Sequence, residues 1–286
     1  MKIFVTGAAG QLGRDAVREL TARGHTAIGS DREYGIPLDI TDREAVIRVL
    51  TETQPDAVIH CAAWTAVDAA EDPENRDAVM TVNRDGTRYI AEACRNIGCK
   101  MLYISTDYVF DGHGDAPWQP DCRDFGPLSV YGRSKLEGEL AVTELLERFF
   151  IVRTAWVFGP VGSHFVRTML RLSETHDTLR VVCDQIGTPT YTPDLARLLA
   201  DMIVTEKYGF YHATNEGGYI SWYDFACEIF RQAGKTVSVI PVTTAEYGLS
   251  KAQRPLNSRL DKSKLIQAGF EPLPDWRDAL ACYFAL

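Results

Sequence analysis

Apolar residues fall in short runs that alternate with stretches of helical spacing along the first half of the chain. "KIFVTG" is a short apolar run that ends in glycine, a pattern that predicts a strand. In the next stretch, Leu12, Ala16 and Leu20 recur at the spacing of one helix face. Gly24 follows that stretch, at a position where glycine ends many helices. The chain is therefore predicted to open with a strand and a helix.

The same alternation continues to about residue 160. The apolar runs "HTAIGSD", "DAVIHCAA", "KMLYISTDYVF" and "RFFIVRTAWVFG" predict four further strands. Between them, Thr41 can cap a helix because Glu44 stands three residues later, and Gly98 can end another helix. Strands that are separated by helices pair in parallel through crossovers. The pattern predicts an α/β fold, with a Rossmann-type doubly wound parallel sheet over residues 1–160.

This rhythm breaks after about residue 160. "VCDQIGTPTYTPDLARLL" is rich in turn residues before it becomes helical, and "YGFYHATNEGGYISWYDFACEIF" predicts a strand, a loop and a helix. "TVSVIPVTTAEY" predicts another strand, and "RPLNSRLDKSKL" a loop that leads into a helix. We expect residues 161–286 to form mainly a smaller C-terminal α/β lobe, whose segments can interleave with the first domain.

Composition narrows the class of protein. The 286 residues are 45% hydrophobic and 24% charged, ordinary values for a globular protein. The net charge of −9 argues against nucleic acid as a partner, because phosphate binding needs clustered lysine and arginine. No stretch of about 18 apolar residues and no signal-peptide pattern occurs. We expect a cytoplasmic protein that binds neither nucleic acid nor membrane, with seven incidental or buried thiols.

Three glycines follow the first predicted strand at a regular spacing. Gly7, Gly10 and Gly13 in "VTGAAGQLG" lie between that strand and the helix, where a phosphate-binding loop stands in dinucleotide-binding folds. Backbone N–H groups at the start of the helix would then face a pyrophosphate. A glycine-rich turn without a ligand is the alternative. We expect a bound dinucleotide.

Side chains at the ends of the next strands could contact such a dinucleotide. Asp31 ends the second strand, where a carboxylate can bind the ribose hydroxyls of NAD(H), whereas the adjacent Arg32 could meet the 2′-phosphate of NADP(H). NADH is therefore slightly favoured, with NADPH open. Asp39 and Ile40 could hold the adenine, although Asp39 could equally be a turn residue. His60 is expected in the strand interior, and small residues after it would let a cofactor lie close.

A phenol and an ammonium group lie one helical turn apart in "SVYGRSKLEGE". Tyr131 and Lys135 face the same way on a helix, and a lysine beside a phenol lowers the pKa of that phenol. The alternative is an ordinary surface pair. Ser105 and Thr106 stand at the carboxyl end of the predicted fourth strand, and so point at the same crevice as Tyr131. These residues together suggest acid–base chemistry beside the dinucleotide.

At these residues the chain resembles the extended short-chain dehydrogenase/reductase family, and within it the branch of dTDP-4-dehydrorhamnose reductases. The resemblance rests on "VTGAAGQLG", "HCAAWTAVDAAE", "YISTDYVFDG", "PLSVYGRSKLEGE", "RTAWVFG", "DQIGTPT" and "RPLNSRLD", which together reach from the first strand to about residue 261. It implies that NADH or NADPH reduces the C4 ketone of dTDP-4-dehydro-L-rhamnose to give dTDP-L-rhamnose. The smaller lobe would mainly bind this dTDP-sugar.

The resemblance also implies roles for individual residues. Thr106, Tyr131 and Lys135 would be catalytic: Tyr131 protonates the forming alkoxide, Lys135 lowers its pKa and binds the nicotinamide ribose, and Thr106 holds the substrate oxygen. The implied cofactor contacts are Gly7, Gly10, Gln11, Leu12, Gly13, Asp31, Asp39, Ile40, Ala62, Ala63, Thr65, Tyr131 and Lys135. The implied substrate contacts are Val67, Asp68, Thr106, Asp107, Trp156, Gln185 and Arg254.

Several of these roles have structural alternatives. Trp156 could instead pack in the core, the loop with Gln185 could be only a turn, and Arg254 could form an ordinary salt bridge rather than bind a substrate phosphate. Some relatives dimerise around magnesium, but Asp15 alone after the glycine loop is more typical of a surface charge near a helix N-terminus, so we expect no essential metal. A homodimer remains open.

Two other functions fit the same motifs. The first is a reductase or epimerase of another nucleotide-4-ketosugar. The second is a dinucleotide-binding regulatory subunit, like that of methionine adenosyltransferase, because a fold does not guarantee turnover.

Overall fold

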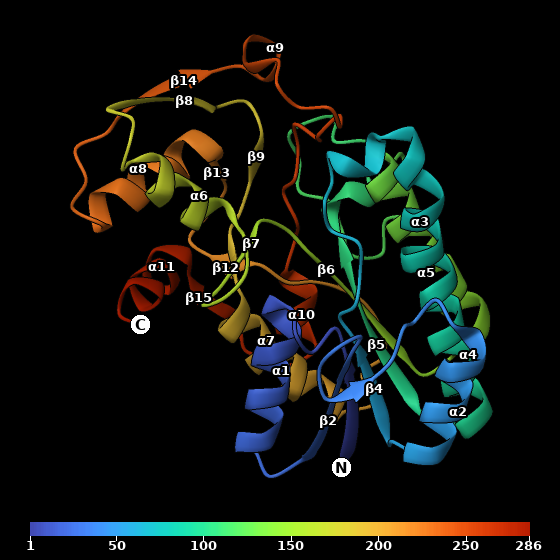
Figure 1. Cartoon of the computed structure of the whole chain (residues 1–286). Helices are drawn as coiled ribbons and strands as arrows, with labels where there is room; N and C mark the ends of the chain where they lie inside the picture. Colours follow the sequence, from blue (N-terminus) through green and yellow to red (C-terminus); the bar gives the residue numbers. More distant parts are fainter.

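A seven-stranded parallel sheet forms the centre of the computed structural model, which describes residues 1–286 (Figure 1). Its strands, in chain order, are β1 (Lys2–Thr6), β2 (Thr26–Asp31), β3 (Ile36–Pro37), β4 (Ala57–His60), β5 (Lys100–Thr106), β6 (Phe149–Thr154) and β11 (Gly209–His212). Their spatial order is β11-β6-β5-β4-β1-β2-β3. The order runs outward in both directions from the centre, so the predicted doubly wound α/β sheet is confirmed.

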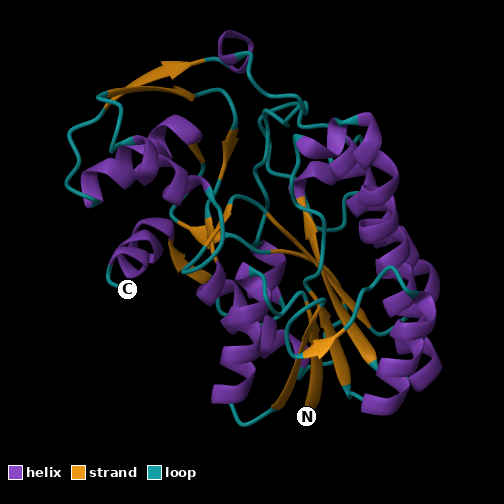
Figure 2. Ribbon diagram, viewed as in Figure 1, coloured by secondary structure: helices purple, strands orange, loops and turns teal.

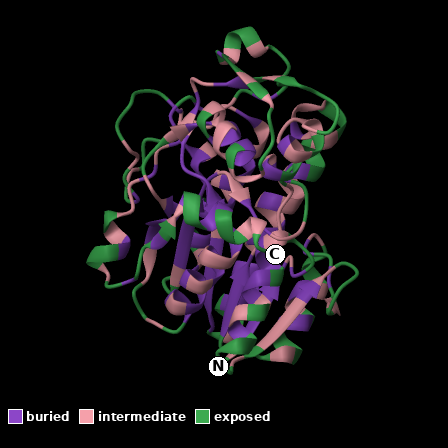
Figure 3. Ribbon diagram, turned by 90° about the vertical axis from the view of Figure 1, so that its left-hand side faces the viewer, coloured by how far each residue is buried: buried purple, intermediate pink, exposed green.

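Helices cover both faces of this sheet (Figures 1 and 2). One face carries α1 (Gln11–Ala22) and α7 (Thr192–Ile203), which pack against each other. The other face carries α2 (Arg43–Thr53), α4 (Thr87–Ile97) and α5 (Val130–Leu145). Each face buries its own apolar cluster, of 22 and 18 residues respectively. The central strands β1, β4, β5 and β6 are therefore apolar on both sides and largely buried, whereas the edge strands β2 and β3 are partly exposed (Figure 3).

The ends of the helices follow local capping chemistry, with one change from expectation. Asp42, not Thr41, caps α2, because its carboxylate accepts a hydrogen bond from the backbone N–H of Ala45 at 3.0 Å. The Thr41 hydroxyl instead donates to the Asp39 carboxylate at 2.7 Å. Gly98 ends α4 in the left-handed conformation (φ 71°), as predicted.

The second lobe lies beyond the carboxyl ends of the sheet strands (Figure 1). Helices α6 (Phe165–Leu172), α8 (Trp222–Gln232) and α11 (Trp276–Phe284) enclose a separate apolar cluster with β8 (Thr178–Val182), which pairs in parallel with β14 (Ser238–Val242). Three small two-stranded sheets complete it: β7 (Val157–Phe158) with β10 (Thr190–Tyr191), β9 (Ile186–Gly187) with β13 (Ile220–Ser221), and β12 (Asn215–Glu216) with β15 (Leu273–Asp275).

Short helices occupy the connections. They are α3 (Arg76–Met80), α9 (Thr244–Tyr247) and α10 (Ser263–Gln267), together with 3₁₀ turns at Ala69–Glu71, Pro73–Asn75 and Asp107–Val109 and a π-helical stretch at Thr81–Gly86. None of the helices is both long and apolar enough to cross a membrane.

The chain passes more than once between the sheet and the smaller lobe. Strand β11 and helix α7 lie beyond residue 160, yet both belong to the sheet and its covering layer. The division of the chain into residues 1–160 and 161–286 stays a proposal.

Candidate active site

A cavity of about 1070 Å³ opens where the carboxyl ends of the sheet strands face the smaller lobe. Most of the residues that the sequence analysis singles out line this cavity: Gly7, Gly10, Gln11, Leu12, Gly13, Asp31, Asp39, Ile40, Ala62, Ala63, Thr65, Val67, Thr106, Asp107, Tyr131, Lys135, Trp156 and Arg254. Asp68 and Gln185 do not line it. The fold thus gathers nearly all of the predicted residues at one place, although they come from segments far apart in the chain.

Two glycines of the loop, Gly7 and Gly13, are packed too closely to carry a side chain. A Cβ atom on Gly13 would lie 2.1 Å from the carbonyl oxygen of Gly7, and a Cβ on Gly7 (φ +67°) would lie 2.6 Å from the backbone nitrogen of Ala62. Helix α1 begins directly after this loop with Gly10 at its N-cap, and no side chain caps it. Its first N–H groups are therefore available to a pyrophosphate.

The ends of β2 and β3 place two carboxylates at the cavity. Asp31 accepts hydrogen bonds from the backbone N–H groups of Ala9 and Arg32, at 3.2 and 2.8 Å. Asp39 accepts from the N–H and the hydroxyl of Thr41, and these hydrogen bonds lower the pKa of its carboxyl group. Asp39 is therefore both a turn residue and part of the cavity wall.

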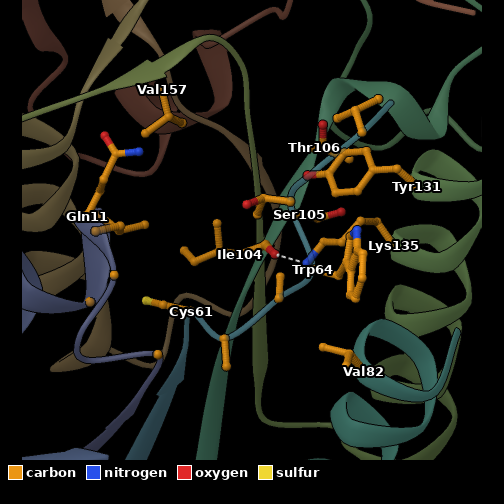
Figure 4. Close-up of a pocket in the computed structure, with 18 of the residues that line it drawn as sticks. Gln11, Cys61, Trp64, Val82, Ile104, Ser105, Thr106, Tyr131, Lys135 and Val157 are labelled. Atoms are coloured by element: carbon orange, nitrogen blue, oxygen red, sulfur yellow. Dashed lines mark hydrogen bonds between the residues drawn. The ribbon is translucent and has the colours of Figure 1, made fainter. Parts of the chain in front are cut away.

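Helix α5 brings Tyr131 and Lys135 to the opposite wall from Gln11 (Figure 4). Ser129, the residue directly before α5, caps the helix by accepting from the N–H of Gly132 at 3.1 Å. The Lys135 ammonium donates to the carbonyl oxygen of Ile104 at 2.7 Å and lies 4.2 Å from the centre of the Tyr103 ring. Burial lowers the pKa of Lys135 to about 7, against a smaller opposing effect of Glu139.

The expected lowering of the Tyr131 pKa by Lys135 is not what the structure gives. The pKa of Tyr131 is raised, first by desolvation of the half-buried phenol and second by the nearby Asp107 carboxylate. A hydrogen bond with Thr106 opposes this shift only in part. The lysine has little influence on the phenol because its ammonium turns to the Ile104 carbonyl and the Tyr103 ring.

Thr106 and Asp107 form a hydrogen-bonded pair at the end of β5. The Thr106 hydroxyl donates to one carboxylate oxygen of Asp107 at 3.0 Å, and the Ser258 hydroxyl donates to the other at 2.5 Å. Burial raises the pKa of Asp107 to about 6 despite both donors. The hydroxyl of Ser105, by contrast, is buried at the cavity and has no partner.

Trp156 and Arg254 line the cavity from the side of the smaller lobe. The Trp156 indole stacks on that of Trp222, with ring centres 3.7 Å apart and planes 15° apart. Arg254 forms a two-pronged ion pair with Asp68, at 2.7 and 3.0 Å, and this pair lowers the pKa of the aspartate. Of the two alternatives for Arg254, the salt bridge is the one that is formed here.

Two expected substrate contacts are not brought to the cavity wall. The Asp68 carboxylate accepts hydrogen bonds from Arg254 and from the backbone N–H of Ala252. The Gln185 side chain is buried and donates to the Thr244 hydroxyl at 3.1 Å. The structure gives no support to a substrate contact by Gln185, because its amide is already paired inside the lobe.

The cavity also has lining residues that the sequence analysis did not identify as site residues. Trp64 follows β4, Tyr108 follows β5, and the smaller lobe adds His164, Phe165 and Trp222. Aromatic residues that follow predicted strand ends were a usable signal for the first two. Nothing in the spacing of the sequence connects His164, Phe165 or Trp222 with the glycine loop.

No group of three or more His, Cys, Asp or Glu side chains is arranged to hold a metal ion. Asp15 is not the surface charge that we expected. It is buried between α1 and α7, where it accepts from the Thr192 hydroxyl at 2.6 Å and pairs with Arg18 at 2.8 Å. Its burial raises the pKa of the carboxyl group. His60, as expected, is a fully buried strand residue between the hydroxyls of Thr6 and Thr87.

A glycine loop after β1, a hydroxyl at the end of β5 and a tyrosine with a lysine one turn later on α5 are combined in the extended short-chain dehydrogenases/reductases. Within this class, the family model of the RmlD substrate binding domain matches residues 1–285. The chain belongs to that family.

Named relatives extend over nearly the whole chain. A dTDP-4-dehydrorhamnose reductase of Streptomyces griseus is 45% identical over 97% of this chain and 91% of its own length. A dTDP-4-keto-6-deoxy-D-glucose reductase of Streptomyces niveus is 37% identical over 99% of this chain and 96% of its own. The crystal structure of a dTDP-4-dehydrorhamnose reductase from Bacillus anthracis in complex with NADP is 40% identical, covers 100% of this chain and 99% of that one, and has a TM-score of 0.93.

Proposed function

We propose that this protein is a dTDP-4-dehydrorhamnose reductase, which uses NADH or NADPH to reduce the C4 ketone of dTDP-4-dehydro-L-rhamnose to dTDP-L-rhamnose. The observation that carries the proposal is the meeting of Thr106, Tyr131 and Lys135 with the glycine loop around one cavity. The names of the relatives supply the substrate class.

The residues present fit a nicotinamide dinucleotide. The uncapped start of α1 suits the pyrophosphate, and Asp31 stands at the cavity where ribose hydroxyls can be bound. Gly7 packs against the Ala62 backbone with no room for a side chain, which keeps the loop close to the sheet. When bound, the reduced nicotinamide supplies the hydride. Since Asp31 favours free hydroxyls, we propose a slight preference for NADH, although Arg32 also lines the cavity and a relative binds NADP.

Tyr131 is the proposed proton donor. Its half-buried phenol lies beside the Thr106 hydroxyl and, like any phenol whose pKa is not lowered, is protonated at neutral pH. It can therefore give its proton to the C4 oxygen as negative charge develops there. Lys135 lies on the same wall of the cavity as Tyr131, where its ammonium can bind the ribose hydroxyls of the nicotinamide (Figure 4).

A reductase of a different dTDP-4-ketosugar is the second candidate. The observation that favours it is the relative from Streptomyces niveus, whose name gives 4-keto-6-deoxy-D-glucose as the sugar. The two functions share cofactor and chemistry, and differ in the sugar and in the configuration of the new hydroxyl.

The test follows NADH and NADPH oxidation by absorbance with dTDP-4-dehydro-L-rhamnose made in situ, and identifies the sugar product. The Tyr131→Phe variant should lose about 10²- to 10⁴-fold in rate, because the proton donor is gone while binding is kept. Tyr89→Phe on α4, away from the cavity, is the matched control. Oxidation only with another 4-ketosugar would move the assignment to the second candidate, and no oxidation by protein that binds the dinucleotide would favour a regulatory role.

Two further proposals concern the setting of the enzyme. We propose a cytoplasmic protein and a homodimer. Sedimentation of the purified chain checks the second.

A further inference from the structure

Trp156 holds a backbone conformation that a large side chain seldom adopts. Its φ of +52° is in the left-handed region, which strains the backbone of a residue other than glycine. Such a conformation persists only where neighbouring groups enforce it. It turns the chain sharply between β6 and β7 and points the indole at the cavity.

The turn "DQIGTPT" holds this strained segment from one side. The N–H of Thr190 donates to the carbonyl oxygen of Trp156 at 3.1 Å, and the Thr190 hydroxyl donates to the carbonyl oxygen of Ala155 at 2.6 Å. Gly187 leaves room for the indole, because a Cβ atom there would lie 3.0 Å from the Trp156 ring. This motif therefore contacts Trp156 even though Gln185 does not reach the cavity.

Trp222 covers one face of the same indole. The two rings lie 3.7 Å apart and nearly parallel, and Phe165 packs on Trp222 at 4.5 Å. Trp222 is the first residue of α8, where Ser221 and Asp224 cap each other's backbone N–H groups. A capped helix start fixes the ring that supports Trp156.

The location of Trp156 shows which part of a ligand it can meet. Thr154 at the end of β6 pairs with Thr106 at the end of β5. Trp156 comes two residues after Thr154, and so lies just beyond the strand ends that carry Thr106. The indole is thus close to the end of the cavity where Thr106 and Tyr131 stand (Figure 4 shows these two with Val157 on the facing wall). An aromatic face there suits the apolar C–H face of a hexose ring rather than the base.

We propose that Trp222 and Gly187 are positioning residues, which hold the Trp156 indole as a preformed wall for the sugar ring of a nucleotide-4-ketosugar. The proposal rests on the proposed function for the identity of the ligand. Neither residue need touch the sugar, because each acts through Trp156. The binding of the cofactor does not depend on them.

The stack can be observed without any turnover. Two indoles in contact couple their electronic transitions and give a paired positive and negative band in the circular dichroism spectrum. Of the five tryptophans, only Trp156 and Trp222 stack on each other. Trp222→Phe and Trp156→Phe should each abolish the paired band, whereas Trp276→Phe, in the core of the lobe, should keep it. Titration with dTDP-L-rhamnose should change the band in the wild type.

Kinetics then separate positioning from a general structural role. Trp222→Ala should raise KM for the sugar nucleotide roughly two- to tenfold, with KM for NADH or NADPH unchanged, and Trp222→Phe should restore most of the loss. Gly187→Ala should raise the same KM while Trp222 stays in place. If Trp222→Ala does not fold, Trp222→Phe and Gly187→Ala still give the answer.

A paired band that survives in Trp222→Phe would overturn the proposal. So would a Trp222→Ala variant that raises the KM for the cofactor as much as the KM for the sugar nucleotide. Failure of the proposed function is a separate result. In that case the wild type would not oxidise NADH or NADPH with the 4-ketosugar, while the paired band and its loss in the variants would still report on the stack.

Discussion

Burial sets the acid–base properties of the side chains around Tyr131. It raises the pKa of Tyr131, lowers that of Lys135 to about 7 and raises that of Asp107 to about 6. Desolvation of these three neighbouring groups brings the lysine close to its charge change at neutral pH, while the phenol stays protonated. A charged ligand bound beside these groups would shift their pKa values further, because the site already excludes much of the water that would screen its charge.

The buried lysine predicts a pH dependence of stability. The folded pKa of Lys135, about 7, lies below its ordinary value of 10.5, so between these pH values only the unfolded chain binds the proton. The free energy of unfolding of the wild type should therefore rise with pH above 7, relative to that of Lys135→Met. Urea unfolding of both proteins at pH 7, 8 and 9 measures this difference. Parallel pH curves would contradict a desolvated lysine.

At the scale of elements, each helix end that positions the site has its own local chemistry. Ser129 caps α5 and so sets where Tyr131 emerges, while α1 begins at an uncapped glycine. Asp42 caps α2, and the preceding Thr41 and Asp39 form the turn beside the cavity. The cap lies one residue later than the capping-box pattern predicts, because the Thr41 hydroxyl is already bonded to Asp39.

This difference in the cap of α2 can be measured. Asp42→Ala removes the acceptor for the Ala45 N–H and should lower the free energy of unfolding by about 1 kcal/mol. Thr41→Ala leaves that acceptor in place and should cost less. Urea unfolding of the two variants compares them, and a larger loss for Thr41→Ala would restore Thr41 as the cap.

At the scale of the whole molecule, a buried ion pair ties α5 to the sheet next to the site. Arg153 on β6 donates to both carboxylate oxygens of Glu139 at 2.8 and 2.7 Å, and both side chains are fully buried. The remaining guanidinium nitrogen of Arg153 donates to the carbonyl oxygen of Pro120 at 3.1 Å. Glu139 lies one turn after Lys135, so this pair helps to fix the helix that carries Tyr131 and Lys135.

Breaking this pair should cost far more than replacing it. Glu139→Gln leaves the Arg153 charge buried without a counter-charge, and should lower the free energy of unfolding by about 3–5 kcal/mol. The double variant Glu139→Leu with Arg153→Leu should be more stable than the single one, because no charge is left in the interior. Denaturant unfolding of both gives the comparison. A double variant that is less stable than Glu139→Gln would mean that the pair contributes net stability.

Contacts between the lobes also belong to this scale. Arg254 and Lys251, on the segment after α9, pair with Asp68 and Asp72 in the first half of the chain, each at 2.7 Å. The segment thus joins the smaller lobe to the region after β4, next to the cavity that Arg254 lines. The sequence left two possible partners for Arg254, a substrate phosphate or a carboxylate of the protein. Only the fold shows that the carboxylate of Asp68 lies within reach.

The parts of the site that sequence patterns predicted are those that local chemistry defines. Gly7, Gly10 and Gly13 are separated by two residues each, and Tyr131 and Lys135 by one helical turn, so spacing alone relates them. Gln185 shows the limit of such reasoning. Its motif suggested a substrate contact, but whether that amide faces the cavity or Thr244 depends on how the lobe packs, and the amide donates to Thr244.

The sequence by itself determined the alternation of strands and helices, the glycine loop between β1 and α1 and the face of α5 that carries Tyr131 and Lys135. Periodicity and turn chemistry are local, and an apolar face has to be buried somewhere. The tertiary structure alone decided the direction of the Tyr131 pKa shift, the burial of Asp15 against Thr192 and the stack of Trp222 on Trp156. Those outcomes depend on desolvation and on contacts between segments far apart in the chain, which exist only once the sheet and the smaller lobe have packed together.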